Sequence, residues 1–91
     1  GYDIRSVDRE GNYRYIEVKA RAKSGAIALT PNEWVMANRL GEEYWLYVVE
    51  QAAGNPQLYL IKNPAASLQP NEQVEIVRYV IRDWRSAAKK A

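Results

Sequence analysis

The strongest constraint on the fold of this chain is the alternation of apolar and charged residues near its beginning. Residues 1–5 and residues 16–19 both follow this pattern, which is typical of half-buried β-strands. The polar cluster at residues 8–12 is typical of a turn. These segments predict a β-hairpin, and the two-residue period of a strand places Glu17 and Lys19 on one face.

The length of the turn in this hairpin decides whether the carboxylates of Asp3 and Glu17 lie on the same face. If residues 8–12 form a five-residue loop, the register places Asp3 directly opposite Glu17. A two-residue turn at Gly11 and Asn12 would instead send the two carboxylates to opposite faces of the hairpin. The sequence alone leaves both registers open.

Asp3 and Glu17, if they are opposed, form a candidate metal site. Like charges directly across a hairpin repel unless a cation, a proton or water separates them. Mg²⁺ prefers oxygen ligands and often takes only one or two carboxylates beside a substrate phosphate, and Mn²⁺ accepts similar ligands. Lys19 lies about 6.6 Å further along the strand, where it would orient a water or stabilise charge on a phosphoryl oxygen. Alternatively, Glu17 and Lys19 form a solvated ion pair.

Basic residues continue beyond this pair at strand spacing. Lys19, Arg21 and Lys23 occupy every second position, and no acidic residue occurs between Glu17 and Glu33. On one strand face, the three basic side chains would contact the phosphate backbone of a nucleic acid. The alternative is a solvated strand face that discourages pairing between sheet edges. The net charge of +2 does not by itself indicate nucleic-acid binding.

The middle of the chain predicts a helix followed by two strands. Thr30 and Glu33 form a capping box around a proline in the first turn, and Gly41 can end the helix. Residues 44–49 are nearly continuously apolar, which favours a central strand covered on both faces. Residues 58–61 predict a second buried strand that pairs with it as a hairpin.

Three further patterns are less specific. Residues 74–81 fit both a strand and a helical stripe, and their β-branched content favours the strand. Residues 86–91 predict a short helical or frayed basic tail. Trp34 is expected in the core, because sites that stack on bases usually expose several aromatic residues together.

The composition narrows the chemistry. The chain of 91 residues predicts a single domain, and the absence of cysteine and histidine excludes disulfides, thiolate or histidine-activated nucleophiles and zinc sites. No apolar run approaches the roughly 20 residues that a membrane span needs, and no signal-peptide pattern opens the chain. We expect an intracellular protein, cytoplasmic in a prokaryote. The start within a strand and without methionine suggests a fragment of a larger protein.

A wider set of motifs resembles one known family. Asp, a variable gap and then Glu-x-Lys is the signature of the PD-(D/E)xK nuclease-like superfamily, and Asp3, Glu17 and Lys19 match it. More specifically, the chain resembles the NO VEIN C-terminal domain family. The matching segments are Gly-Tyr-Asp-Ile-Arg-Ser at 1–6, Ile-Glu-Val-Lys at 16–19, Leu-Thr-Pro-Asn-Glu-Trp at 29–34 with Ala37, Tyr-Trp-Leu-Tyr-Val-Val at 44–49 and Asn-Pro at 63–64.

The resemblance implies an α/β domain with a restriction-endonuclease-like core, namely a mixed sheet of five or six strands with one main helix, lacking the N-terminal helix of the superfamily. It implies Asp3 and Glu17 as metal ligands, Lys19 as the catalytic lysine, Mg²⁺ as the cofactor and DNA as the partner. Family members commonly lie at the C-terminal end of helicase-like or ATPase proteins, and some accompany restriction or phage-defence systems.

Three functional hypotheses follow from these residues and this resemblance. The leading one is a Mg²⁺-dependent nuclease-like domain, active as a hydrolase only within a larger parent protein. The second is a non-catalytic nucleic-acid or protein-docking module that keeps the nuclease fold. The third treats the charged residues of the hairpin as surface positions without a binding role.

Overall fold

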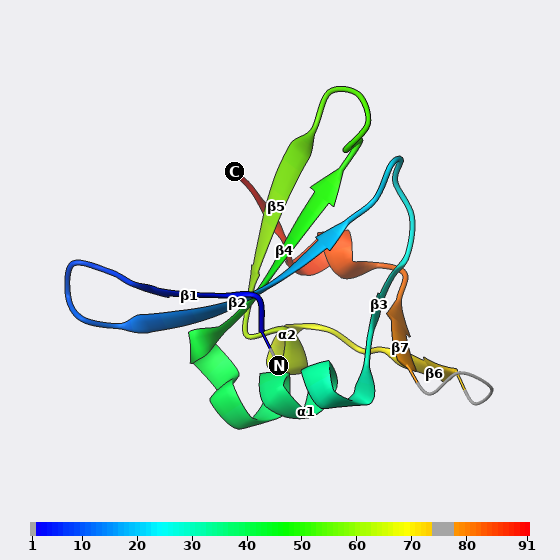
Figure 1. The fold of residues 1–91 in the computed structure, drawn as a ribbon. Coiled ribbons are helices and arrows are strands. Elements are labelled where there is room, and N and C mark those ends of the chain that lie inside the picture. Colours follow the sequence, from blue (N-terminus) through cyan, green and yellow to red (C-terminus); the bar gives the residue numbers. More distant parts are fainter. Residues whose placement is uncertain (1, 74–77) are drawn as a thin grey trace.

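The computed structural model describes residues 2–73 and 78–91, which form two sheets and a main helix (Figure 1). The main sheet has the order β1-β2-β4-β5-β8, and a smaller sheet has the order β3-β7-β6. The strands are β1 (Ile4–Val7), β2 (Tyr13–Ala20), β3 (Ile27–Leu29), β4 (Tyr44–Glu50), β5 (Gln57–Lys62), β6 (Asn71–Gln73), β7 (Arg78–Ile81) and β8 (Lys89–Lys90). The helices are α1 (Pro31–Leu40) and α2 (Pro64–Ser67), with 3₁₀ turns η1 (Gly41–Glu43) and η2 (Trp84–Ala87).

The hairpin of β1 and β2 has the register of the five-residue loop. Val7 pairs with Tyr13 in the antiparallel ladder, so the two-residue turn is excluded. The Asp8 carboxylate accepts the backbone N–H groups of Glu10 and Asn12, each at 2.9 Å. These bonds close the loop locally, in the way that aspartate commonly does in turns. Figure 1 shows the hairpin projecting away from the rest of the molecule.

A crossover through β3 and α1 connects β2 to β4, its parallel neighbour. The other neighbouring pairs of the main sheet are antiparallel, so the sheet is mixed, as predicted. β4 lies centrally and pairs with β5 as the expected hairpin. Tyr44, Leu46 and Val48 are buried on one face of β4, whereas the alternate residues are only half-buried. The expectation of complete cover on both faces was therefore wrong.

The helix α1 begins and ends where the local sequence predicts. The Thr30 hydroxyl accepts the N–H of Glu33 at 3.1 Å, and the Glu33 carboxylate accepts the N–H of Thr30 at 2.9 Å. Gly41 follows the last helical residue with φ of 57°, a conformation that glycine adopts at little cost. Trp34 packs against the core with its ring centroid 5.4 Å from that of Tyr79, as expected for a core residue.

The core lies between the main sheet and the smaller sheet. Its buried residues are Ile27, Leu29, Leu46, Val48, Ile61, Leu68, Ile81 and Trp84. They come from both sheets, the segment after α2 and η2, so elements far apart in the sequence share one apolar interior. Within the described residues, no helix is long and apolar enough to cross a membrane.

The C-terminal segment differs from the prediction. Instead of a helical or frayed tail at residues 86–91, the chain leaves η2 and adds β8 to the edge of the main sheet. The Ala91 N–H donates to the Leu58 carbonyl at 2.9 Å and extends this pairing. The strand predicted over residues 74–81 is confirmed at Arg78–Ile81, and residues 74–77 lie outside the described part of the chain.

Removing the N-cap of α1 should destabilise the chain. Thr30→Ala leaves the Glu33 N–H without its capping oxygen, and we expect the free energy of unfolding to fall by about 1 kcal/mol. Thr30→Ser keeps the hydroxyl and should stay close to the wild type. Urea denaturation followed by circular dichroism measures both variants. Equal stability of the alanine and serine variants would contradict a role for the cap.

Candidate functional site

The hairpin fixes Asp3 against the strand that carries Glu17. The register that pairs Ile4 with Ile16 places Asp3 opposite Glu17 one position further on. The Asp3 N–H donates to the Ile16 carbonyl at 2.8 Å, and Asp3 Oδ2 accepts the Val18 N–H at 2.8 Å. The structure therefore has the register that places Asp3 opposite Glu17.

Glu17 and Lys19 lie on one face of β2, and Lys19 connects that face to the first turn of α1. Glu17 is only 5% exposed, and its Oε2 lies 3.6 Å from the Lys19 ammonium. The same ammonium lies 2.8 Å from Oε1 of Glu33, which belongs to the first turn of α1. We call Asp3, Glu17, Lys19 and Glu33 the acid–lysine cluster.

Glu33 is the member of the cluster that the sequence analysis did not identify as a site residue. Its position predicted only a capping box, and that prediction is correct. In the structure, Oε1 of Glu33 accepts both the Thr30 N–H and the Lys19 ammonium. A single oxygen therefore caps the helix and joins it to β2. The lack of another acid between Glu17 and Glu33 was the one signal in the sequence that Lys19 would turn to Glu33.

The two glutamates of the cluster have opposite pKa shifts. Burial, followed by a hydrogen bond with the Glu33 carboxyl and the charge of that group, raises the pKa of Glu17 to about 7, and the opposing effect of the Lys19 charge is smaller. Burial also opposes ionisation of Glu33, but hydrogen bonds from Lys19 and the Thr30 backbone outweigh it and lower the pKa of Glu33. Near neutral pH, Glu33 is therefore ionised and pairs with Lys19, while Glu17 is in equilibrium between its protonated and ionised forms.

Tyr44 extends the site along β4. It is fully buried and pairs in register with Tyr15, two residues before Glu17. Burial raises the pKa of the Tyr44 phenol, and the charges of Glu17, Glu33 and Asp3 raise it further. The phenol therefore remains protonated beside the carboxylates, where it supplies a polar group that carries no charge.

Asp3 and Glu17 could together hold a divalent cation. In residues 2–73 and 78–91, no group of three or more acidic, histidine or cysteine side chains is arranged to hold a metal. A cation at this position would therefore take two protein carboxylates and complete its shell with water or phosphate, which is a common arrangement for Mg²⁺. The oxygen donors fit such an ion, and so do the negative charges of Glu33 and Asp3, which add to burial in raising the pKa of Glu17.

The basic stripe expected along one strand does not form as a strand face. β2 ends at Ala20, so Lys19 is the member that lies in the strand, and its ammonium is turned to Glu33. Arg21 and Lys23 are exposed in the loop that follows. The Arg21 N–H still donates to the Val49 carbonyl at 2.8 Å, which fixes the beginning of this loop beside β4.

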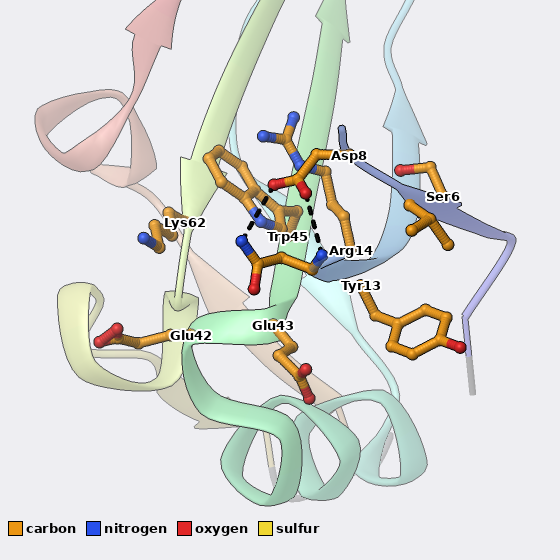
Figure 2. Close-up of a pocket in the computed structure, with 10 residues that line it drawn as sticks. Ser6, Asp8, Tyr13, Arg14, Glu42, Glu43, Trp45 and Lys62 are labelled. Carbon is orange, nitrogen blue, oxygen red and sulfur yellow. Dashed lines mark hydrogen bonds between the residues drawn. The ribbon is translucent and has the colours of Figure 1, made fainter. Parts of the chain in front are cut away.

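The hollow drawn in Figure 2 is lined by Arg14 and Trp45, which the strand register places on the opposite face of the main sheet from Glu17. It has a volume of about 590 Å³ and lies between the hairpin turn and the beginning of β4. The Arg14 guanidinium stacks 3.8 Å from the centroid of the Trp45 ring and donates to the Tyr47 hydroxyl at 2.7 Å. The hollow therefore contains none of the predicted site residues, and its arginine is already held by aromatic side chains.

Comparison with known families identifies the chain. The model of the family described as Protein NO VEIN, C-terminal, matches residues 1–61. The chain belongs to this family. The match includes all four members of the acid–lysine cluster and ends within β5. No curated protein and no solved structure matches the chain.

The raised pKa of Glu17 predicts a pH dependence of stability in this NO VEIN C-terminal domain. A carboxyl whose pKa rises from 4.5 to about 7 on folding binds its proton more tightly in the folded state. Its contribution to stability is therefore fully present below pH 4.5 and is lost as the pH rises through 7. We expect Glu17→Gln to become more stable than the wild type over this interval, by on the order of 1–3 kcal/mol at alkaline pH.

Urea unfolding of both chains between about pH 4 and pH 8 measures this difference. Glu10→Gln is the matched control, because Glu10 is exposed in the hairpin turn. The control should follow the wild type throughout. Parallel curves for Glu17→Gln and the wild type would contradict the assigned proton affinity of Glu17.

Proposed function

We propose that this chain is a nuclease-like domain that binds DNA and hydrolyses phosphodiester bonds with the help of Mg²⁺. The observation that carries the proposal is the buried Glu17, with Asp3 opposite it on the hairpin and Lys19 on its own face of the strand. An almost fully buried carboxylate beside a second acid costs stability, and such arrangements occur more often at functional sites than elsewhere.

Each side chain of the cluster has a role in this proposal. Asp3 and Glu17 would hold the metal, which when bound supplies Lewis acidity and a more acidic water. Lys19 would orient the attacking water or stabilise negative charge on the phosphoryl oxygens. Glu33 keeps the lysine ammonium within 3.6 Å of Glu17 by binding it at 2.8 Å.

The order of the elements supports the same assignment. The acid of the first strand and the Glu-x-Lys of the second strand lie on one hairpin, and a parallel strand follows through a helix. This is the arrangement that the resemblance to the PD-(D/E)xK superfamily implies. The exposed Arg21 and Lys23 lie beyond Lys19 in the chain and are available to a phosphate backbone. A linked helicase or ATPase in a longer protein is part of the same proposal.

A second candidate function is a non-catalytic docking module, and one contact favours it. The Lys19 ammonium is already bound to Glu33, so the pair also fastens α1 to the main sheet. A cluster with this structural purpose needs no metal. Such a module would bind nucleic acid in a salt-dependent manner without a requirement for divalent ions.

A metal titration separates the two functions. We expect Mg²⁺ to cause saturable shifts of the backbone amide NMR signals at residues 3 and 17–19 of the 91-residue chain, and paramagnetic Mn²⁺ to broaden the same signals. The shifts should be lost in Asp3→Asn and in Glu17→Gln, because each variant removes one charged ligand. Glu10→Gln removes an equal charge from an exposed position and should leave them unchanged.

A wild-type chain without a localised response to either metal would contradict the catalytic proposal and favour the docking module. A response that persists in both site variants would place the metal elsewhere. Where the localised response is present, cleavage of plasmid DNA by the wild type but not by Glu17→Gln would extend the assignment from binding to hydrolysis.

A further inference from the structure

A second hollow lies beyond the acid–lysine cluster, where the loop after β2 meets η2. Its volume is about 560 Å³. The residues that line it are Ser24, Gly25, Ala26, Glu50, Arg82, Trp84 and Arg85. We call it the arginine hollow. Three segments that are distant in the sequence meet here, which indicates that packing rather than local conformation forms it.

Two contacts hold the walls of the arginine hollow together. Trp84 is 2% exposed, and its indole N–H donates to the Gly25 carbonyl at 2.9 Å. Gly25 has φ of 140°, a conformation that other residues rarely adopt, so glycine is needed for the loop to approach the indole. The loop and η2 are therefore fixed relative to each other, and the hollow does not depend on flexible side chains alone.

Arg85 is held in position within this hollow. Its guanidinium forms an ion pair with Glu50, which is 3% exposed, and lies 4.9 Å from the Tyr59 ring and 5.0 Å from the Trp84 ring. The side chain of Arg85 nevertheless remains 48% exposed. A planar guanidinium has five N–H donors, so a pairing through one nitrogen leaves others for a ligand.

The charge of the arginine hollow favours an anion. The Oε2 atom of Glu50 is buried and has no hydrogen-bond partner among the described residues, so a ligand meets the guanidinium groups rather than this oxygen. Arg82 adds a second exposed guanidinium to the lining. The Arg21 guanidinium lies 3.5 Å from the position that a Cβ of Gly25 would take, so it lies beside the loop that forms one wall of the hollow. Asp83 is the exposed acid of the same segment.

The arginine hollow and the acid–lysine cluster lie along the same face of the main sheet. Glu50 belongs to the buried face of β4, and the register of β2 and β4 puts Glu17 and Lys19 on this same face of the sheet. Arg21, exposed in the loop after β2, follows Glu17 by four residues, which corresponds to roughly 13 Å along an extended chain.

We propose that the arginine hollow binds the phosphodiester backbone of a nucleic acid, with Arg82 and Arg85 contacting phosphates and Glu50 positioning Arg85. Arginine suits this ligand because its fork of donors matches the geometry of phosphate oxygens. The choice of ligand rests on the proposed function, but binding in the hollow requires neither a metal nor cleavage. The hollow anchors the strand beside the cluster and carries no sequence preference.

Binding of a fluorescein-labelled 20-nucleotide DNA, single-stranded and duplex, tests this proposal by fluorescence anisotropy without divalent ions. Arg82→Gln should weaken binding roughly fivefold and reduce the slope of log Kd against log salt concentration by about 1, because one phosphate contact is lost. Arg9→Gln is the matched control, since Arg9 is exposed in the distant hairpin turn and carries the same charge. Its binding should stay close to that of the wild type.

Arg85 needs a paired variant, because removing it alone leaves a buried carboxylate without its partner. Glu50→Gln together with Arg85→Gln removes both charges, and circular dichroism checks its fold. We expect this variant to bind more weakly although its net charge is unchanged. Binding by Arg82→Gln that equals binding by Arg9→Gln would overturn the arginine hollow while leaving the metal site intact. A wild type that binds neither DNA at low salt would overturn both the hollow and the DNA-binding part of the proposed function.

Discussion

The ion pair between Lys19 and Glu33 is the contact on which the arrangement of the site depends. Glu33 caps α1 and binds the lysine through the same oxygen, so the beginning of the helix is fixed to the end of β2. Glu17, beside this ion pair, is only 5% exposed. When Glu17 is protonated, the lysine and Glu33 balance each other. When Glu17 loses its proton, the enclosed site has one negative charge in excess, and Asp3 across the hairpin adds to it. A cation is the simplest group that restores the balance.

The local sequence predicts those parts of the structure that local interactions determine. Alternation predicted the strands of the first hairpin, and the capping box predicted the beginning of α1, since both depend on neighbouring residues. The register remained open in the sequence because a loop of five residues and a turn of two residues both suit the polar segment. In the structure, the Asp8 carboxylate takes the N–H groups that close the longer loop. The convergence of Asp3 and Glu17 then follows from that register.

The remaining features depend on contacts between distant segments, which no local pattern records. Glu33 enters the site because the first turn of α1 lies within ion-pair distance of Lys19 on β2, although the spacing of Glu33 indicates only a cap. β8 is two residues long, and it forms by pairing with the edge of β5, a contact between distant segments. The stripe at residues 19–23 failed as a strand face because β2 ends at Ala20, and the loop then carries Arg21 towards Gly25 and η2. Arg21 therefore lies beside Gly25, a residue that lines the hollow together with Arg82 and Arg85, which are some 60 positions further along the chain.

The family match includes the acid–lysine cluster but not the C-terminal residues of the arginine hollow. The acid–lysine cluster lies within residues 1–61, whereas Arg82, Trp84 and Arg85 lie beyond them. The matched residues therefore contain the hairpin, the helix α1 and the cluster, whereas the arginine hollow also includes residues of the C-terminal part of the chain. A fold can keep its central chemistry while the segments around it change the ligand that it holds. In this chain, the C-terminal segment completes the core with Trp84 and also supplies Arg82 and Arg85 to the hollow. Stability and the proposed binding of a phosphate backbone therefore depend on the same segment.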